Sequence, residues 1–309
     1  MLAGILVCLL CGTVARPARA QDSEDSLRDQ ITSKMRAGQI DAAVDLARLA
    51  AGQYPQSSPL YQLLGAALFK KGLSDEARRA FRRAIELDPS NPQNYFDLAL
   101  VNLSEKRYGE AATQLETYLR LDPDNAQAHL LLGRAYHNLN RTVPAIQQFR
   151  RALALAPTLP LAHYHLGYAY QSQGNSKAAL EEYLKEIENN PGFYDAYHLA
   201  GNIELDQGNL ERAEELFRKA IGVKPQAGEA HYGLARVLLG KKQFPEGVAE
   251  LQKALEAAPN KVEIHYALAR AYQQMGKKDE AQREFRICAE LHARSQGQRS
   301  GIAGAGENP

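Results

Sequence analysis

The chain has 309 residues, of which 45% are apolar and 24% are charged, and its formal net charge is +1. These proportions are ordinary for a folded chain, and the small net charge gives no overall attraction to nucleic acid or to an acidic membrane. Leu, Ala, Glu, Gln and Arg recur while alternating runs of β-branched residues are absent, so the sequence favours helices and no sheet.

The beginning of the chain differs from the rest. Residues 2–14 are mostly apolar and uncharged, a run too short to span a bilayer comfortably. Ala18, Arg19 and Ala20 then form a small-x-small cleavage site. The pattern predicts a signal peptide over 1–20, cleaved after Ala20, and a periplasmic or secreted mature chain without a transmembrane segment. No Lys or Arg precedes the apolar run, so either the amino terminus supplies the charge or the true start lies upstream. An uncleaved anchor is the alternative interpretation.

Prolines recur at intervals of 34 residues along most of the chain. They are Pro55, Pro89, Pro123, Pro157, Pro191, Pro225 and Pro259. This register divides the chain into eight units, in which positions are counted from the first residue. The units are 24–57, 58–91, 92–125, 126–159, 160–193, 194–227, 228–261 and 262–295.

Other positions repeat in the same register. Position 20 is Ala in seven units and Gly in one. From the second unit on, position 8 is Gly or Ala and position 24 is large and apolar or aromatic. Position 15 is Gly in five units, at Gly38, Gly72, Gly174, Gly208 and Gly276. Small residues at positions 8 and 20 allow two antiparallel helices to approach closely, and Gly at position 15 tolerates the conformation that ends the first helix.

The unit 126–159 resembles a tetratricopeptide repeat. Its signature residues are His129, Leu132, Gly133, Tyr136, Ala145, Phe149, Ala152 and Pro157. The resemblance covers residues 24 to about 295. It implies an all-α fold, a right-handed tetratricopeptide-repeat (TPR) superhelix, or α-solenoid, of eight helix-turn-helix repeats in residues 21–295. Because one repeat cannot bury its own apolar face, the repeats must stack.

Both ends of the array and two helix starts carry further signals. In the first unit, Leu27, Ile31 and Met35 form one apolar stripe, which suits a cap on the array. Ser58 and Asn91 precede prolines, and we expect their side chains to cap the helices that follow. Residues 296–309 are rich in Gly without a large apolar cluster, and this composition predicts a disordered tail.

The family resemblance implies that positions 2, 5, 9, 12 and 13 of the first helices face a binding groove. The candidate partner-binding residues are Phe96, Arg134, Tyr164, Tyr168, His198, Asn202, Tyr232, Arg236, Tyr266 and Arg270. Tyr232/Arg236 and Tyr266/Arg270 repeat in adjacent units, and residues four apart share a helix face. Such pairs could hold an extended peptide, with Tyr giving flat apolar contact and Arg pairing with carboxylates. Duplication of one stable repeat is the alternative explanation.

Other groups of polar residues have simpler explanations. Four histidines occupy position 4, where the family prefers an aromatic residue, and we expect packing roles rather than metal ligation: His129, His163, His231 and His265. Arg78, Arg79, Arg82 and Arg83 form a basic helix face that we expect to be solvated. It does not continue across units, so nucleic-acid binding is not expected. Only Cys288 remains after signal removal, so the mature chain has no internal disulfide.

The chain has no phosphate-binding Gly loop, no nucleophile elbow and no zinc-helix motif, so we expect no catalysis, cofactor or metal. The sequence therefore predicts a non-enzymatic adaptor that binds a peptide or helix of a partner protein in its groove. Two alternatives stay open. One is a structural subunit of an envelope assembly machine, such as outer-membrane or pilus biogenesis, and the other is a regulatory subunit of a separate enzyme.

Overall fold

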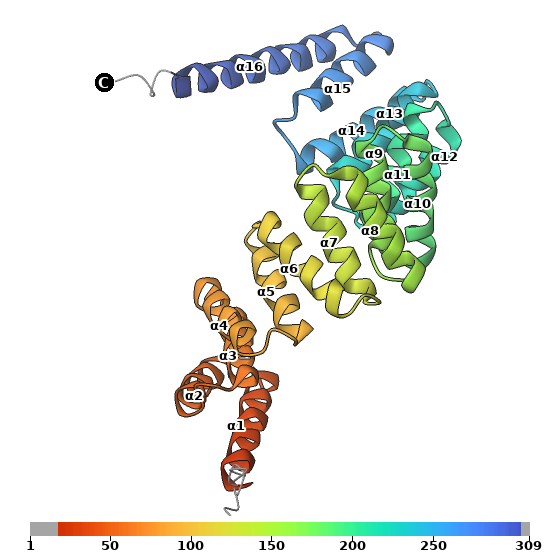
Figure 1. Ribbon diagram of the computed structural model, residues 1–309. Helices are drawn as coiled ribbons and strands as arrows, with labels where there is room; N and C mark the ends of the chain where they lie inside the picture. Colours follow the sequence, from red (N-terminus) through yellow and green to blue (C-terminus); the bar gives the residue numbers. More distant parts are fainter. Residues whose placement is uncertain (1–17, 304–309) are drawn as a thin grey trace, which may run out of the picture. The chain divides into compact units, whose positions relative to one another are not determined.

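The computed structural model describes the backbone of residues 18–303 and the side chains of residues 24–294. This part of the chain contains sixteen α-helices and no strand (Figure 1). It divides into two compact units, of which the first ends at Asn140 and the second begins at Arg141. The expected all-α architecture is confirmed, since two helices fall in each of the eight repeats.

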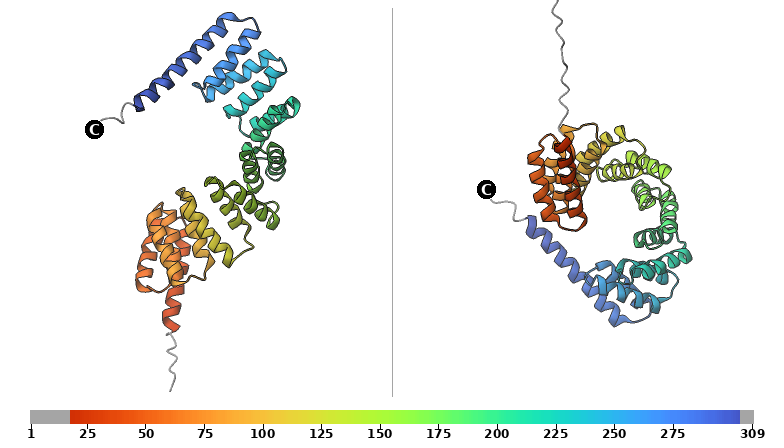
Figure 2. Two further views of the ribbon diagram at one scale, coloured as in Figure 1. Left: turned by 45° about the horizontal axis from the view of Figure 1, so that its top comes forward. Right: turned by 90° about the horizontal axis from the view of Figure 1, so that it is seen from below.

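The helices of the first unit are α1 (Ala18–Arg36), α2 (Ile40–Gln53), α3 (Ser58–Lys70), α4 (Ser74–Leu87), α5 (Pro92–Ser104), α6 (Tyr108–Leu121) and α7 (Ala126–Asn138). Those of the second unit are α8 (Thr142–Leu155), α9 (Ala162–Ser172), α10 (Ser176–Asn189), α11 (Tyr194–Asp206), α12 (Leu210–Val223), α13 (Gly228–Gly240), α14 (Phe244–Ala257), α15 (Val262–Gln274) and α16 (Lys278–Ala303). Within each unit, consecutive helices pack side by side (Figure 2). None of the described helices is long and apolar enough to cross a membrane.

The ends of the chain differ in how far the structure describes them. Residues 1–17, most of the predicted signal peptide, lie outside the described residues, so that prediction stays a prediction. At the other end, α16 continues to Ala303, so residues 296–303 are helical where the sequence predicted disorder, and residues 304–309 of the predicted tail lie outside the described residues. The reason is that α16 contains no proline and runs mostly through Ala, Arg, Gln and Glu, which favour helix despite two glycines.

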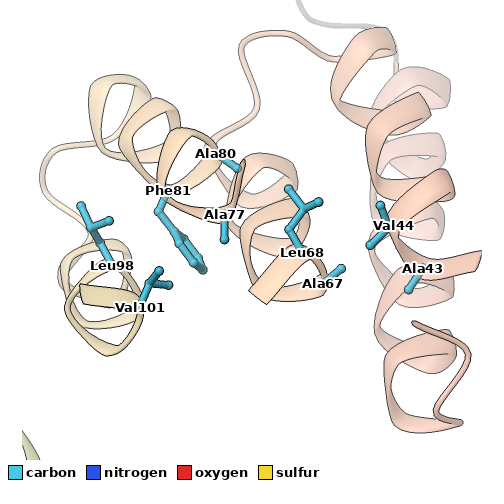
Figure 3. Close-up of a cluster of buried hydrophobic side chains, with 9 residues drawn as sticks. All are labelled: Ala43, Val44, Ala67, Leu68, Ala77, Ala80, Phe81, Leu98 and Val101. Atoms are coloured by element: carbon cyan, nitrogen blue, oxygen red, sulfur yellow. The ribbon is translucent and has the colours of Figure 1, made fainter. Parts of the chain in front are cut away.

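The core continues from one repeat to the next. One cluster joins α2 to α5 across three repeats (Figure 3). Its buried members are Ala43, Val44, Ala67, Leu68, Ala77, Ala80, Phe81, Leu98 and Val101. At the start of the array Ile31 is fully buried against α2 and α3, with Leu27 and Met35 packed beside it, as the apolar stripe predicted.

Close contact between the two helices of a repeat depends on position 8. A Cβ atom built on Gly65 would lie 2.8 Å from the ring of Phe81 at position 24, and one on Gly167 would lie 2.8 Å from the ring of Tyr183. Where position 8 is Ala instead, as at Ala99, position 24 of the same repeat is the smaller Leu115. In these repeats the two positions share a limited volume, because a close-packed core leaves little room for both a methyl group and a ring. The last repeat has both, Ala269 and Phe285, but there the Phe285 ring is only partly buried.

All eight turns between the helices of a repeat place position 15 in the left-handed region. The five predicted glycines have φ of 74° to 85°, and Lys106, Asn140 and Lys242 have φ of 58° to 62°. This conformation costs a residue with a Cβ atom about 1–2 kcal/mol. The turn geometry is therefore imposed by helix packing even where the sequence does not supply a glycine.

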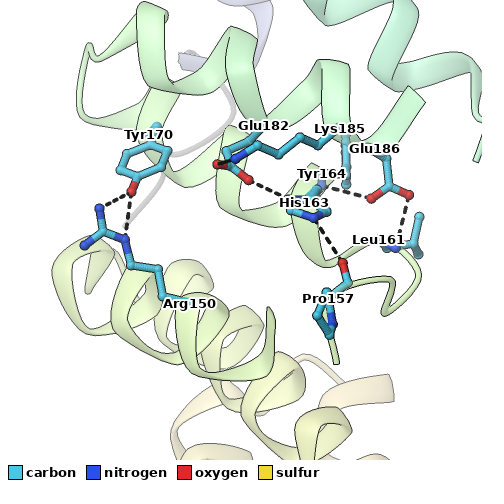
Figure 4. Close-up of polar contacts among 9 residues, drawn as sticks. All are labelled: Arg150, Pro157, Leu161, His163, Tyr164, Tyr170, Glu182, Lys185 and Glu186. Carbon is cyan, nitrogen blue, oxygen red and sulfur yellow. Dashed lines mark hydrogen bonds and ion pairs between the residues drawn. The ribbon is translucent and has the colours of Figure 1, made fainter. Parts of the chain in front are cut away.

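Successive repeats are joined by hydrogen bonds to the carbonyl groups of the repeating prolines. Tyr95 Oη donates to Pro89 O over 3.1 Å, and the four position-4 histidines place Nε2 at 2.9–3.2 Å from the carbonyl oxygen six residues earlier. In three repeats the other ring nitrogen, Nδ1, lies 2.6–2.7 Å from a glutamate of the second helix. Figure 4 shows one such link, in which His163 lies between Glu182 and Pro157.

The same region contains a substituted helix cap. Leu161, at φ 66°, precedes α9, and its amide donates to Oε1 of Glu186 over 3.2 Å (Figure 4). The amide of Tyr164 donates to Oε2 of the same carboxylate over 3.3 Å. Glu186 occupies position 27, where five other repeats have Ala, and it is buried. It therefore satisfies free amides at a helix start that has no capping side chain of its own.

Two expectations about polar side chains were wrong. The cap of α3 is Ser57, whose hydroxyl accepts from the amide of Leu60, while Ser58 is buried and donates to the carbonyl of Ala84. Asn91 caps α5 as expected. Arg78 is buried rather than solvated, because Asp75 on its own helix and Glu105, the cap residue after α5, pair with its guanidinium.

We expect Gly65→Ala to destabilise the chain by about 1–3 kcal/mol, because the added methyl group overpacks the contact with Phe81. The double variant Gly65→Ala/Phe81→Leu recreates the Ala99–Leu115 pair and should recover most of the loss. Gly222→Ala is the control, since nothing lies within 4 Å of its added Cβ and Ala favours helix. Urea unfolding compares the parent, the control, the single variants Gly65→Ala and Phe81→Leu, and the double variant. Additive effects of the two substitutions would contradict the shared-volume explanation.

The contacts between the position-4 histidines and the glutamates of the second helices predict that the free energy of unfolding depends on pH. Burial opposes ionisation of Glu182 and Glu250, but hydrogen bonds from Lys185 or Lys253 and from the histidines outweigh it, so both pKa values fall below the usual 4.5. A lowered pKa gives stability that is present above pH 4.5 and lost as pH falls through the folded-state value.

The variant Glu182→Gln/Glu250→Gln should therefore have a lower urea midpoint of unfolding than the parent at pH 7. The difference between the two midpoints should become smaller below pH 4.5. Glu188→Gln, an exposed change on the same helix as Glu182, should leave the midpoint unchanged at every pH. A difference in urea midpoint that stays constant from pH 7 to pH 3 would show that the two carboxylates contribute no pH-dependent stability.

Candidate peptide-binding surface

The candidate residues fall on first helices in both units and do not form one set. Phe96 on α5 packs into the core of the first unit, with its ring centroid 5.2 Å from that of Tyr118. Arg134 is exposed on α7. The other eight lie in the second unit on α9, α11, α13 and α15, where α13 contacts both α11 and α15.

On α9, Tyr164 and Tyr168 belong to an aromatic cluster. The Tyr164 ring meets Phe193 edge-on at 4.9 Å and stacks on Tyr168 at 6.3 Å. Burial raises the pKa of Tyr164, with the charge of Asp195 adding to the effect. Tyr168 remains 44% exposed. This end of the surface therefore offers one packed ring and one ring open to solvent.

Four candidates line a single hollow of about 230 Å³ in the second unit: His198, Asn202, Tyr232 and Arg236. The rest of its wall comes from the first turns of α13 and α15, from the end of α14 and from the segment between α14 and α15. These additional residues are Gly228, Glu229, Ala257, Ala258, Lys261 and Ile264. The wall thus combines apolar groups with both signs of charge, a composition suited to a polypeptide segment.

His198 contributes a neutral ring to this hollow. Burial lowers its pKa, opposed by the charges of Glu229 and Asp195, so the ring is uncharged at pH 7. The amide nitrogen of Asn202 lies 3.1 Å from Nε2 of His198 and donates to it, which places the ring proton on Nδ1. Nδ1 is buried and has no hydrogen-bond partner among the described residues.

The two predicted Tyr/Arg pairs differ in the structure. Burial raises the pKa of Tyr232, and the charge of Arg236 opposes the rise, so the pair is close enough to interact. Arg236 also forms a loose ion pair of 3.4 Å with Asp206. Tyr266 is 53% exposed and meets Phe285 edge-on at 6.0 Å, while Arg270 forms no ion pair with another described residue.

Lys261 and Ile264 were not predicted to line the site, because neither occupies a groove position of the family pattern. Lys261 is the residue before α15, and Ile264 is at position 3 of the last repeat. A signal was present, since Pro259 ends α14 close to the first turn of α15 and so brings this short segment to the helix start. The described residues contain no group of three His, Cys, Asp or Glu side chains that could hold a metal ion.

Comparison with known proteins places these features in a family. The tetratricopeptide-repeat model matches residues 28–92, 62–118, 96–160, 145–194 and 198–262, and a second model of the same repeat matches 238–287. A small glutamine-rich tetratricopeptide repeat-containing protein 2 from Mycosarcoma maydis is 43% identical over 54 residues, 18% of this chain. The peroxisomal targeting signal receptor of Eremothecium gossypii is 34% identical over 80 residues, 26% of this chain. The matches span only 15% and 14% of those two proteins.

Solved structures show similar arrays. MamA is 30% identical with a TM-score of 0.51, covering 52% of this chain and 95% of its own. YrrB, described as a TPR protein with an unusual peptide-binding site, is 25% identical with a TM-score of 0.53 and covers 63% of this chain and 97% of its own. With family models matching nearly the whole described array, the chain belongs to the tetratricopeptide-repeat family.

Proposed function

We propose that this chain is a non-enzymatic adaptor that binds a peptide or helical segment of a partner protein on the first-helix face of α9 to α15. The observation that carries the proposal is the hollow of about 230 Å³, which brings together His198, Asn202, Tyr232 and Arg236. This volume suits one or two side chains of a bound segment. Its mixed wall offers apolar contact together with hydrogen-bonding groups.

Three further features support a peptide as the ligand. Tyr168 and Tyr266 extend the aromatic surface beyond the hollow on both sides along the repeats and remain open to solvent. Aromatic side chains give large contact area at low entropic cost and are frequent at binding hot spots. YrrB, a relative of the same fold, carries a peptide-binding site according to its description.

The test is selection of displayed random peptides on the full chain, followed by affinity measurement of the recovered sequences. The variant Arg236→Glu/Tyr266→Ser changes two exposed side chains of the surface, and we expect it to weaken the recovered peptides about tenfold or more. Lys219→Glu, on α12, the second helix of its repeat, is the matched control and should leave affinity unchanged. If no recovered peptide discriminates between these variants, this surface is not the binding site.

We further propose that the adaptor acts in the periplasm or cell envelope, or outside the cell, after removal of residues 1–20. Support comes from the uncharged apolar run that precedes Ala18 and Ala20. Amino-terminal sequencing of the protein from its native host should give a chain that begins at Gln21. A mature chain that begins at Met1 would contradict export by cleavage.

A further inference from the structure

The first-helix face of the last three repeats carries its charges in separate rows. Position 2 is acidic on α11, α13 and α15, at Asp195, Glu229 and Glu263. All three are exposed, and none forms an ion pair or a side-chain hydrogen bond with another described residue. They differ in this respect from acids of the second helix α12, such as Glu214 and Glu215, which pair with lysine or arginine.

A row of rings lies beside the acidic row. Each ring at position 5 is close enough to the acid of the following repeat for that charge to act on its ionisation. The pairs are Tyr164 with Asp195, His198 with Glu229, and Tyr232 with Glu263. The same offset of 31 residues recurs three times, so the two rows run next to each other across the first helices.

Basic residues lie on the other side of the rings. Arg236 and Arg270 occupy position 9 of α13 and α15, one helical turn beyond Tyr232 and Tyr266. Lys261, which borders the hollow near Glu229, is the one basic residue of the wall on the acidic side. Lys224, whose Nζ lies 5.2 Å from the centre of the Tyr194 ring, is a second lysine on this side, next to Asp195. The acidic row therefore has three carboxylates and two nearby lysines, and the basic row has two guanidinium groups, one of them loosely paired with Asp206.

The separation of the rows fits a particular occupant. Seven residues from position 2 to position 9 span about 10 Å along a helix axis, which matches the 10–12 Å diameter of an α-helix with its side chains. An extended strand, with neighbours spaced about 4.8 Å apart, would cover only one charged row at a time. Two helix packing distances of 8–10 Å separate α11 from α15, so about 12 residues of a bound helix would cross all three repeats.

Helix dipoles alone explain part of this pattern. An acid in the first turn stabilises any helix, and second helices of this chain also begin with acids, for instance Glu246 in α14. The dipole does not explain why the three acids border a line of rings. Nor does it explain the arginines one turn beyond those rings or the hollow between the two rows.

We infer that this three-row surface binds an amphipathic α-helix with an apolar stripe, a basic flank and an acidic flank. The stripe lies on the rings, the basic flank on Asp195, Glu229 and Glu263, and the acidic flank on Arg236 and Arg270. The inference rests on the proposed function and adds the chemistry and the direction of the partner. Reversing the helix would place each flank on the row of like charge.

The test uses two synthetic 18-residue probes of identical composition, both labelled with fluorescein. Both carry one leucine stripe. The segregated probe has Lys on one flank and Glu on the other, and the mixed probe has both residues on both flanks. Fluorescence anisotropy with the full chain at low salt should show the segregated probe binding about fivefold tighter, because several exposed ion pairs each add a small contribution.

Charge-reversed variants then assign the preference to the rows. Glu229→Lys/Glu263→Lys should abolish the preference for the segregated probe. Adding Arg236→Glu/Arg270→Glu, which exchanges the two rows, should restore it, because the probe can bind in the opposite direction. Glu246→Lys/Asp279→Lys is the matched control, since it reverses two exposed first-turn acids of second helices and should keep the preference.

Equal binding of the two probes to the parent chain, or no binding of either, would overturn the inference. A preference that persists in Glu229→Lys/Glu263→Lys would also overturn it. These outcomes are separable from failure of the proposed function. If the affinity of displayed peptides depends on Arg236 and Tyr266, the proposed function stands even when the chain binds the segregated and mixed probes equally.

Discussion

The hydrogen bond from position 4 of one repeat to the proline carbonyl of the repeat before it is the contact on which the arrangement of the first helices depends. It uses a phenol at Tyr95 and an imidazole at His129, His163, His231 and His265. In these five repeats the bond fixes the start of the first helix against the end of the preceding second helix. Positions 2 and 5, on either side of position 4, are thereby held in the same place in every linked repeat.

The proline has two roles in this arrangement. Its ring stops the second helix, and the carbonyl left without a helical partner accepts the bond from the next repeat. A repeat array is stabilised by such nearest-neighbour terms, because distant repeats do not touch. The glutamates that approach Nδ1 of His163, His231 and His265 extend the link to the second helix of the same repeat. Each such imidazole therefore joins three segments of the chain.

The register of the fold could be read from the sequence, since the prolines and the small residues at positions 8 and 20 mark both helices of all but the two end repeats. Details that depend on three-dimensional packing could not. The local sequence around Lys106 and Lys242 does not predict their left-handed backbone conformation, because the packing of the neighbouring helices imposes that conformation. Arg78 looks like its exposed neighbours until the carboxylate of Glu105, from the next repeat, is placed beside it.

The candidate surface shows the same limit. Tyr232 and Arg236 could be predicted from their positions in the repeat, because the 34-residue register and the 3.6 residues per helical turn determine which residues share a helix face. Lys261 and Ala258 were missed, since they come from a segment whose position is set by the end of α14 rather than by a helix face. Phe96 was named because it occupies the same position as Tyr232, yet the first unit uses that position for core packing against Tyr118.

The acids at position 2 connect folding with recognition. At the first turn of a helix a carboxylate is stabilised by the free amides, so Asp195, Glu229 and Glu263 can remain unpaired at little cost to the fold. A basic row at the same place would oppose the helix dipole, so it belongs farther along the helix, where Arg236 and Arg270 lie. Helix electrostatics therefore favours acids rather than bases at position 2, and a partner with a basic flank would bind carboxylates that also stabilise the helices that carry them.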